Sequence, residues 1–156
     1  MKTSKRFDLA IKKLYDSFHN NTLNPRCCYQ CAVGNILDNT DFWKHFTDLH
    51  GSLKLSYVGL VHQNLGKTFN GYSPKELLEI EHVFLEKCGF LSHTQLQNNQ
   101  RSEKTKDILF EGLSAVVSLL CRFDNITNVM NTSKLFDYTI NEKVLSISNC
   151  SKSSEL

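Results

Sequence analysis

KTKDILFEGLSAVVSLLCRF, residues 104–123, is the most regularly patterned stretch of this 156-residue chain. Its apolar side chains recur every three or four positions, which is the period of one face of an α-helix. The apolar stripe consists of Leu109, Leu113, Val116, Val117 and Leu120. Because a stripe of this width has to be buried against other elements, we expect residues 104–123 to form the central helix of a helical bundle.

Two further segments carry strong helix signals. Residues 4–19 repeat apolar side chains at three- and four-residue steps between charged ones, as an amphipathic helix does. Ser73 precedes a proline and Glu76 follows three positions later, which is the pattern of a capping box. A helix is therefore predicted over residues 74–88, and Gly89 fits the left-handed residue that ends many helices.

The rest of the chain gives shorter elements. We predict helices over residues 25–37, 41–49 and 55–65, although the alternation of Leu53, Leu55 and Tyr57 also fits a strand, a polar loop over 93–103, and a small hairpin of strands 135–140 and 143–147. The expected fold is thus mainly α: a single-domain bundle of five or six helices over residues 1–149, with the hairpin as an optional addition. Residues 150–156 have too little apolar content to pack and are expected to form a disordered tail.

Composition excludes several classes of protein. Apolar residues make up 40% and charged residues 22% of the chain, as in globular domains, and the net charge of +2 is spread without a basic stripe for nucleic acid. The longest nearly apolar run is too short to cross a bilayer, and no signal sequence is recognisable. We therefore expect a cytoplasmic protein, in which six cysteines are free, ligand-bound or transiently redox-active.

Three of these cysteines, Cys27, Cys28 and Cys31, lie within the five positions 27–31, shortly after Asn24. Asn24 can cap a helix, so the cysteines are expected in its opening turns, where free N–H groups and the helix dipole favour a thiolate. Cys28 and Cys31 are three positions apart and would then share one helix face. Such a pair can chelate a metal ion, form a reducible disulfide, or simply fill the core.

A metal centre would need more ligands than two thiolates. The candidate centres are zinc and iron–sulfur, both of which cysteine thiolates bind. His50 lies beside a glycine at an expected helix end, and His62 follows an apolar run, so both are candidate imidazole ligands. The predicted metal-binding set is Cys28, Cys31, Cys27, His50, His62 and Cys88, with Cys121 as a further sulfur.

Two other interpretations compete with a metal or redox site. In the first, the cysteines are core residues and the protein is a non-catalytic helical module that binds another protein. In the second, Trp43 lines an apolar ligand pocket of a small enzyme together with Phe42, Phe46 and Tyr57. No glycine-rich phosphate loop, nucleophile elbow or H-E-x-x-H pattern occurs, so no NAD or flavin site is recognisable.

A family resemblance is carried by MKTSKRFDLAIKKLY, CAVGNI, LHGSLKLSYVGLVHQNLG, NGYSP and residues 113–125, which together span most of residues 1–137. These stretches resemble a small bacterial family commonly labelled as the F component of the Na+-translocating NADH-quinone reductase. Full-length proteins of that name carry a membrane anchor, a plant-type [2Fe–2S] domain and flavin- and NADH-binding domains. Because Cys27, Cys28 and Cys31 do not form the C-x4-C-x2-C run of such a cluster, we do not expect a stand-alone NADH:quinone oxidoreductase.

Overall fold

The computed structural model describes residues 4–89, 106–126 and 132–138. Within these ranges the protein is mainly α-helical, which confirms the predicted fold class. The elements are α1 (Lys5–His19), α2 (Ala32–Ile36), the 3-10 helix η1 (Phe42–Phe46), α3 (Tyr57–Asn64), α4 (Pro74–Cys88), α6 (Lys106–Phe123) and α7 (Thr132–Leu135). No helix within the described ranges is both long enough and apolar enough to span a membrane.

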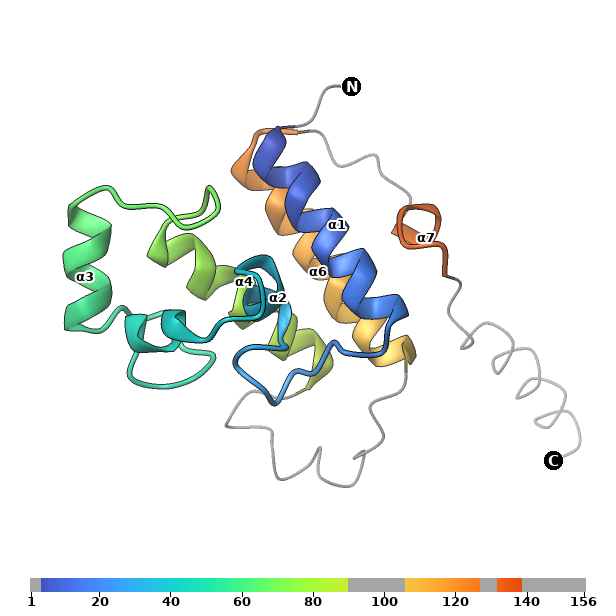
Figure 1. Ribbon diagram of the computed structural model, residues 1–156, viewed down its shortest axis with the longest axis horizontal. Coiled ribbons are helices and arrows are strands. Elements are labelled where there is room, and N and C mark those ends of the chain that lie inside the picture. Colours follow the sequence, from blue (N-terminus) through green and yellow to red (C-terminus); the bar gives the residue numbers. More distant parts are fainter. Residues whose placement is uncertain (1–3, 90–105, 127–131, 139–156) are drawn as a thin grey trace, which may run out of the picture.

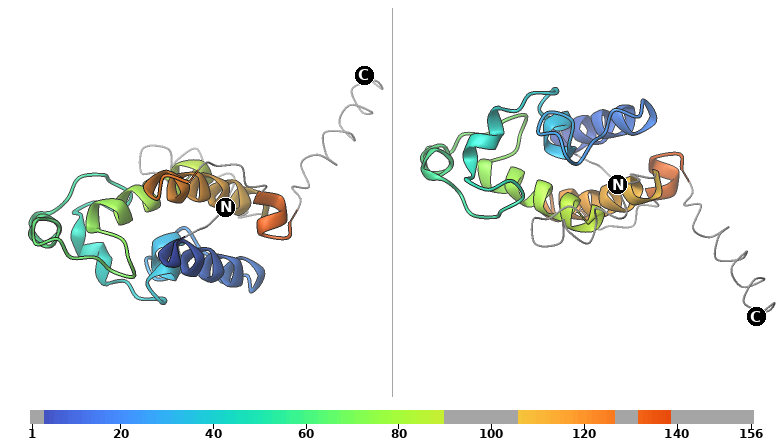
Figure 2. Two further views of the ribbon diagram at one scale, coloured as in Figure 1. Left: turned by 90° about the horizontal axis from the view of Figure 1, so that it is seen from above. Right: turned by 90° about the horizontal axis from the view of Figure 1, so that it is seen from below.

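Helices α4 and α6 form the most extensive helix pair of the fold. Helix α1 contacts α6 and α2, while α2, α3 and η1 all contact α4. Figure 1 shows α3 and η1 at one end of the molecule and α1, α6 and α7 at the other. In the two views of Figure 2, α1 lies in one layer and the α4–α6 pair in the other. The short helix α2 therefore sits where the two layers and the α3 end meet.

The apolar stripe predicted for α6 is its buried face. Leu113, Val116 and Leu120 are fully buried, and the face packs against α4. Gly112 lets the two helices approach closely, since a Cβ atom in that position would lie 2.7 Å from the sulfur of Cys88. The confirmed stripe explains why α4 and α6 form the centre of the structure.

Helix α4 begins and ends as the sequence predicts. The Ser73 hydroxyl accepts from the Glu76 N–H, and the Glu76 carboxylate accepts from the Ser73 N–H, which completes the capping box. Gly89 ends the helix with a φ of 78°. Caps of this kind each contribute about 1 kcal/mol and fix the helix register. Side chains on the inner face of α4 are therefore held at defined positions.

A polar cluster joins the start of α1 to α4 and to the end of α6. The Arg6 guanidinium donates through Nε to Asp124 at 2.8 Å and through Nη1 to Glu76 at 3.2 Å. It also donates to the Gly71 carbonyl and lies 4.5 Å from the ring centroid of the buried Tyr72. The guanidinium of Arg6, with this many partners, links the start of α1 to the start of α4 and to the end of α6.

The prediction of one helix over residues 25–37 is wrong. The Asn24 side chain accepts from the Arg26 N–H, and the Asn24 N–H donates to the Gln30 carbonyl at 2.8 Å, so the chain closes into a loop instead of a helix. Only Ala32–Ile36 is helical, with Cys31 as its N-cap. The loop forms because asparagine side chains compete for backbone groups: the Asn35 amide also donates to the Gln30 carbonyl.

Three other predictions change in extent. The aromatic helix expected over residues 41–49 is the 3-10 helix Phe42–Phe46, because the chain becomes extended at Thr47, whose hydroxyl donates to the Lys54 carbonyl at 2.7 Å. The helix expected over 55–65 is confirmed as Tyr57–Asn64. The part of the expected first strand that the structure describes, residues 135–138, is not a strand: Leu135 ends α7 and a turn follows. Residues 139–147 of that hairpin, the 93–103 loop and the tail lie outside the described residues.

Candidate thiol site at Cys28, His50 and Glu81

The structure brings together three of the predicted site residues, Cys28, Cys31 and His50. Cys28 lies in the closed loop before α2, Cys31 caps that helix, and His50 lies in the loop between η1 and α3. The Cys28 Sγ lies 3.4 Å from the His50 Nδ1, within hydrogen-bonding distance for sulfur. A histidine 22 positions along the chain is thus placed directly against the thiol.

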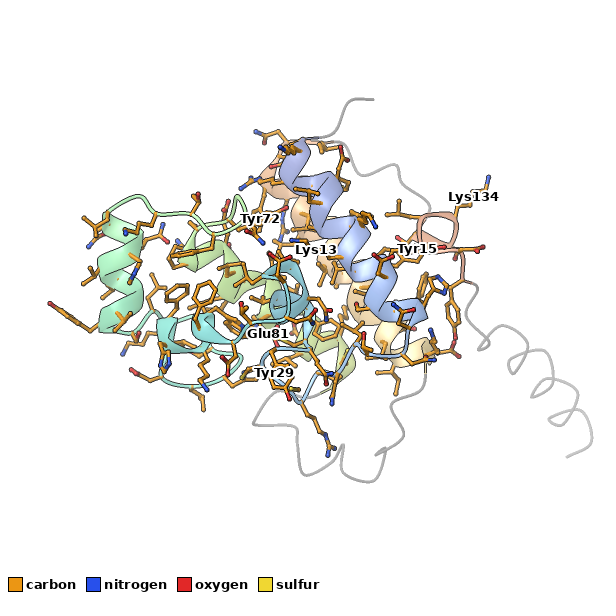
Figure 3. The ribbon with its side chains drawn as sticks, viewed as in Figure 1. Lys13, Tyr15, Tyr29, Tyr72, Glu81 and Lys134 are labelled. Carbon is orange, nitrogen blue, oxygen red and sulfur yellow. The ribbon has the colours of Figure 1, made fainter. Side chains whose placement is uncertain are left out.

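The other nitrogen of His50 faces a buried carboxylate. His50 Nε2 lies 3.2 Å from Glu81 Oε2, which is ion-pair distance, although the angles do not meet those of a hydrogen bond. Glu81 is fully buried on α4, and its other oxygen accepts from the Val33 N–H at 3.4 Å. Figure 3 shows Glu81 deep in the middle of the molecule, between α2 and α4. A buried carboxylate needs compensating partners, and the imidazole of His50 is a polar side chain that faces it.

Cys31 is completely buried, in contrast to the partly exposed Cys28. Its sulfur accepts from the Gly34 N–H at 3.4 Å, and its S–H donates to the Cys28 carbonyl at 3.4 Å. Burial raises the pKa of Cys31 well above its ordinary value, the charge and hydrogen bond of Glu81 raise it further, and the Gly34 N–H lowers it. Cys31 is therefore a protonated thiol next to a carboxylate.

The expectation that the helix dipole makes Cys28 a thiolate is not supported. Burial raises the pKa of Cys28, the charge of Glu81 raises it further, and Lys44 only partly offsets these effects. The physical reason is the loop, which places Cys28 before the helix and within the field of a carboxylate. Cys28 therefore needs a base to ionise, and His50 is in position to act as one.

Trp43 contacts both Cys28 and His50. Its indole Nε1 donates to the Cys28 carbonyl at 2.9 Å, and its ring centroid lies 5.7 Å from that of His50. The side chain has no exposed surface. Gly34 supports the loop from the other side, because a Cβ atom there would lie 2.5 Å from the Cys28 carbonyl oxygen. The thiol site is thus fixed by close packing.

The remaining predicted ligands lie elsewhere or face away. His62 on α3 has its Nδ1 2.9 Å from the Val58 carbonyl, and its ring packs on Phe46. Cys88 is buried against α6, with its S–H 3.7 Å from the Ile108 carbonyl, and burial raises its pKa. Cys27, in the same loop as Cys28, is partly exposed. Cys121 is buried in α6.

Within the described ranges, no group of three or more His, Cys, Asp or Glu side chains is arranged to hold a metal ion. The geometry explains this result, because Cys28 and Glu81 lie at different nitrogens of one imidazole. Donors to a metal converge on one point, whereas a nucleophile, a base and an orienting carboxylate lie in a row. Cys28, His50 and Glu81 lie in such a row and do not converge on one point.

The aromatic residues divide between two sides of η1. Phe42, Phe46 and Tyr57 line a cavity of about 690 Å³ together with His62 and Phe69, while Trp43 faces the thiol site instead. Three of the four aromatic residues that the sequence grouped as a possible pocket lining thus share one cavity, and Trp43 does not line it.

Glu81 is the member of the site that the sequence analysis missed. A usable signal exists, because Glu81 falls four positions after Leu77 and three before Phe84, in the middle of the buried face of α4. An acidic residue at such a position is rare and needs a partner.

Comparisons with protein-family models, curated proteins and solved structures found no match to the chain.

Proposed function

We propose that this protein is a thiol–disulfide redox protein in which Cys28 and Cys31 alternate between two thiols and one disulfide, while His50 and Glu81 carry the protons. The observation that supports the proposal is the continuous row from the Cys28 sulfur through both nitrogens of His50 to Glu81, with distances of 3.4 and 3.2 Å. Cys31 adjoins the end of that row. A single carboxylate therefore serves both thiols.

In the first step, the partly exposed Cys28 is the attacking group. Its proton passes to His50 Nδ1, and the thiolate attacks one sulfur of a substrate disulfide, which breaks that bond and forms a mixed disulfide. The departing substrate thiolate takes the proton back from the imidazolium. Glu81 stabilises the positive charge on His50 while it exists, as the carboxylate of a catalytic triad does.

In the second step, the buried Cys31 resolves the mixed disulfide. Its proton passes to Glu81, its thiolate attacks the Cys28 sulfur, and the second substrate thiolate leaves and is protonated by way of His50. Two electrons move from the cysteine pair to the substrate disulfide, which becomes two thiols. The raised pKa of Cys31 keeps this step dependent on Glu81, because the thiol does not ionise unaided.

A cytosolic setting would suit this cycle, since a reducing compartment returns the disulfide to two thiols. The test uses the reduced protein and the chromogenic disulfide 5,5′-dithiobis(2-nitrobenzoate). Wild-type protein should release two chromophores per Cys28–Cys31 pair and form that disulfide, as mapped by mass spectrometry. Cys31→Ser should stop at a stable mixed disulfide on Cys28, and Cys28→Ser should form neither product.

Cys27→Ser is the matched control, because it removes the neighbouring thiol but leaves the row intact. It should still form the Cys28–Cys31 disulfide at the wild-type rate, and only the chromophore that Cys27 itself releases should be lost. A Cys28→Ser variant that still oxidises Cys31 at the wild-type rate, or a wild-type protein whose Cys31 stays reduced, would contradict the proposal. Labelling of Cys28 and Cys31 only after denaturation would instead favour the non-catalytic interaction module.

A zinc or iron–sulfur centre is the second proposal. One observation favours it: Cys28 and His50 are close enough to share an ion, and Glu81 lies on the far nitrogen, where metal-bound histidines usually have a carboxylate partner. Metal analysis of protein purified without oxygen tests it. Stoichiometric metal that is lost in the Cys28→Ser/Cys31→Ser double variant would support the centre, and metal-free wild-type protein would remove it.

A further inference from the structure

Large exposed apolar side chains are concentrated in one stretch of the described chain. They are Leu9, Tyr29, Phe42, Leu49, Leu53, Tyr57, Val58, Leu60, Val61 and Leu65. All but Leu9 fall between residues 29 and 65, in the segment that supplies His50, η1 and α3 and that begins next to Cys28. Concentrated apolar surface of this kind is typical of a site that binds another molecule.

Three of these residues adjoin the thiol site and are called the apolar rim: Tyr29, Leu49 and Leu53, which are 49%, 57% and 50% exposed. Tyr29 follows Cys28 directly, and Leu49 precedes His50. The loop that carries the two leucines is fastened to α4, because the His82 Nδ1 lies 2.8 Å from the Gly51 carbonyl. Figure 3 shows Tyr29 at the lower edge of the molecule, beneath Glu81.

Charge near the thiol gives little recognition of a small ionic substrate. The charged side chains that act on Cys28 besides Glu81 are Lys44 and Asp41, and these two form an ion pair of 3.1 Å. Opposite charges at this distance largely cancel for an approaching molecule. The Lys44–Asp41 pair therefore offers little net charge to a disulfide whose own groups are carboxylates and ammonium groups, whereas apolar side chains can contact the rim.

We infer, on the basis of the proposed function, that the substrate disulfide lies in an apolar segment of another polypeptide, which docks on Tyr29, Leu49 and Leu53 while Cys28 attacks. Such a segment buries the rim on binding, and the gain in apolar burial favours it over a small disulfide of equal reactivity. The Cys28 thiol beside the rim implies that the bound segment contains a disulfide, and the exposed apolar side chains imply that this segment is apolar.

Two disulfide-bonded peptides of equal net charge provide the test, one with leucine and phenylalanine beside its cysteines and the other with serine. Wild-type protein should reduce the apolar peptide roughly tenfold faster, a factor that corresponds to burial of about one apolar side chain. The Leu49→Ser/Leu53→Ser variant should lose most of this preference. Its rate with 5,5′-dithiobis(2-nitrobenzoate) should stay within about twofold of wild type, which shows that the thiol chemistry is intact.

Leu9→Ser is the matched control, because Leu9 is 44% exposed on α1, outside the segment between residues 29 and 65. It should leave the peptide preference unchanged. Equal rates with both peptides, a preference that survives in the rim variant, faster reaction with an organic hydroperoxide than with either peptide, or a dimer that the rim variant dissociates would each overturn the inference. Failure of wild-type protein to oxidise with the small disulfide would instead overturn the proposed function itself.

Discussion

His50 Nε2 and Glu81 Oε2 face each other at 3.2 Å, and neither atom has a hydrogen-bond partner among the described residues. A fully buried carboxylate in this situation costs stability, because burial removes its hydration without a complete set of donors in return. Groups that are costly for the fold are retained where they serve chemistry. The position of this carboxylate next to a histidine that contacts a thiol is the basis of the functional account.

Glu81→Gln should separate activity from stability. The amide is isosteric but carries no charge to stabilise the imidazolium. Loss of the Glu81 charge also lowers the pKa of Cys28, but Glu81 lies against His50 Nε2 and Cys28 lies at the other nitrogen, so the effect on His50 dominates. Alkylation of Cys28 at pH 7 should therefore slow by about tenfold or more. The free energy of unfolding should stay unchanged or rise, because a buried charge is removed. Iodoacetamide kinetics and urea unfolding measure the two quantities.

Glu86→Gln, on the exposed side of α4, is the control and should change neither quantity. A Glu81→Gln protein that is strongly destabilised but reacts at the wild-type rate would show that Glu81 is a structural residue.

Trp43→Phe should shift the chemistry of the thiol. The variant keeps a ring near His50 but removes the N–H that donates to the Cys28 carbonyl at 2.9 Å. The loop then loses a fixed position relative to the imidazole, so the curve of Cys28 alkylation against pH should move. Phe110→Leu, a destabilising change in the core of α6, is the control and should keep the wild-type curve. An unchanged curve in Trp43→Phe would show that Trp43 contributes only to packing.

Gly34→Ala should destabilise the loop. The added Cβ would lie 2.5 Å from the backbone of Cys28 and Tyr29, which has no side-chain freedom to move aside, so a loss of about 1–3 kcal/mol is expected. Gly66→Ala is the matched control: its φ of 74° costs about 1 kcal/mol, but nothing lies within 4 Å. Thermal unfolding compares them, and an equal loss in both would mean that the loop packs less tightly than described.

Stability should fall at alkaline pH. The pKa of Cys31 in the folded protein lies well above the ordinary thiol value of 9.0, so above that pH the unfolded chain loses this proton while the folded protein keeps it. The contribution is complete below pH 9 and is then lost by about 1.4 kcal/mol per pH unit until the folded thiol also ionises.

Cys31→Ser supplies the comparison, since serine is also a good N-cap for α2 but has no thiol to ionise. Its unfolding free energy should decline less steeply above pH 9. Identical slopes for the two proteins, measured by urea unfolding at a series of pH values, would argue against the protonated state of Cys31.

The sequence predicted the long helices because their signals are local. The apolar stripe of α6, the capping box at Ser73 and the glycine at the end of α4 each lie within a few positions of the structure they specify. The loop at Cys28 was missed because asparagine side chains outcompeted helix formation, an outcome that depends on which backbone groups the fold leaves free.

The candidate site was predicted in part for a related reason. Cys28 and Cys31 are close in the sequence, whereas His50 and Glu81 reach them only because α2 and η1 both pack against α4. His50 was one of two histidines that the sequence favoured as ligands, and Glu81 was recognisable only as an acidic residue on an apolar helix face. Long-range placement of this kind follows from tertiary structure and cannot be obtained from local patterns.

A redox titration tests the central claim most directly. The protein is equilibrated in buffers of stepped dithiol and disulfide ratio, the thiols are trapped with acid and alkylated, and the linkage is mapped by mass spectrometry. We predict a single two-electron transition that belongs to a Cys28–Cys31 disulfide, with Cys88 and Cys121 reduced throughout. Cysteines that stay reduced under all of these conditions, or a disulfide that joins a different pair, would contradict the account.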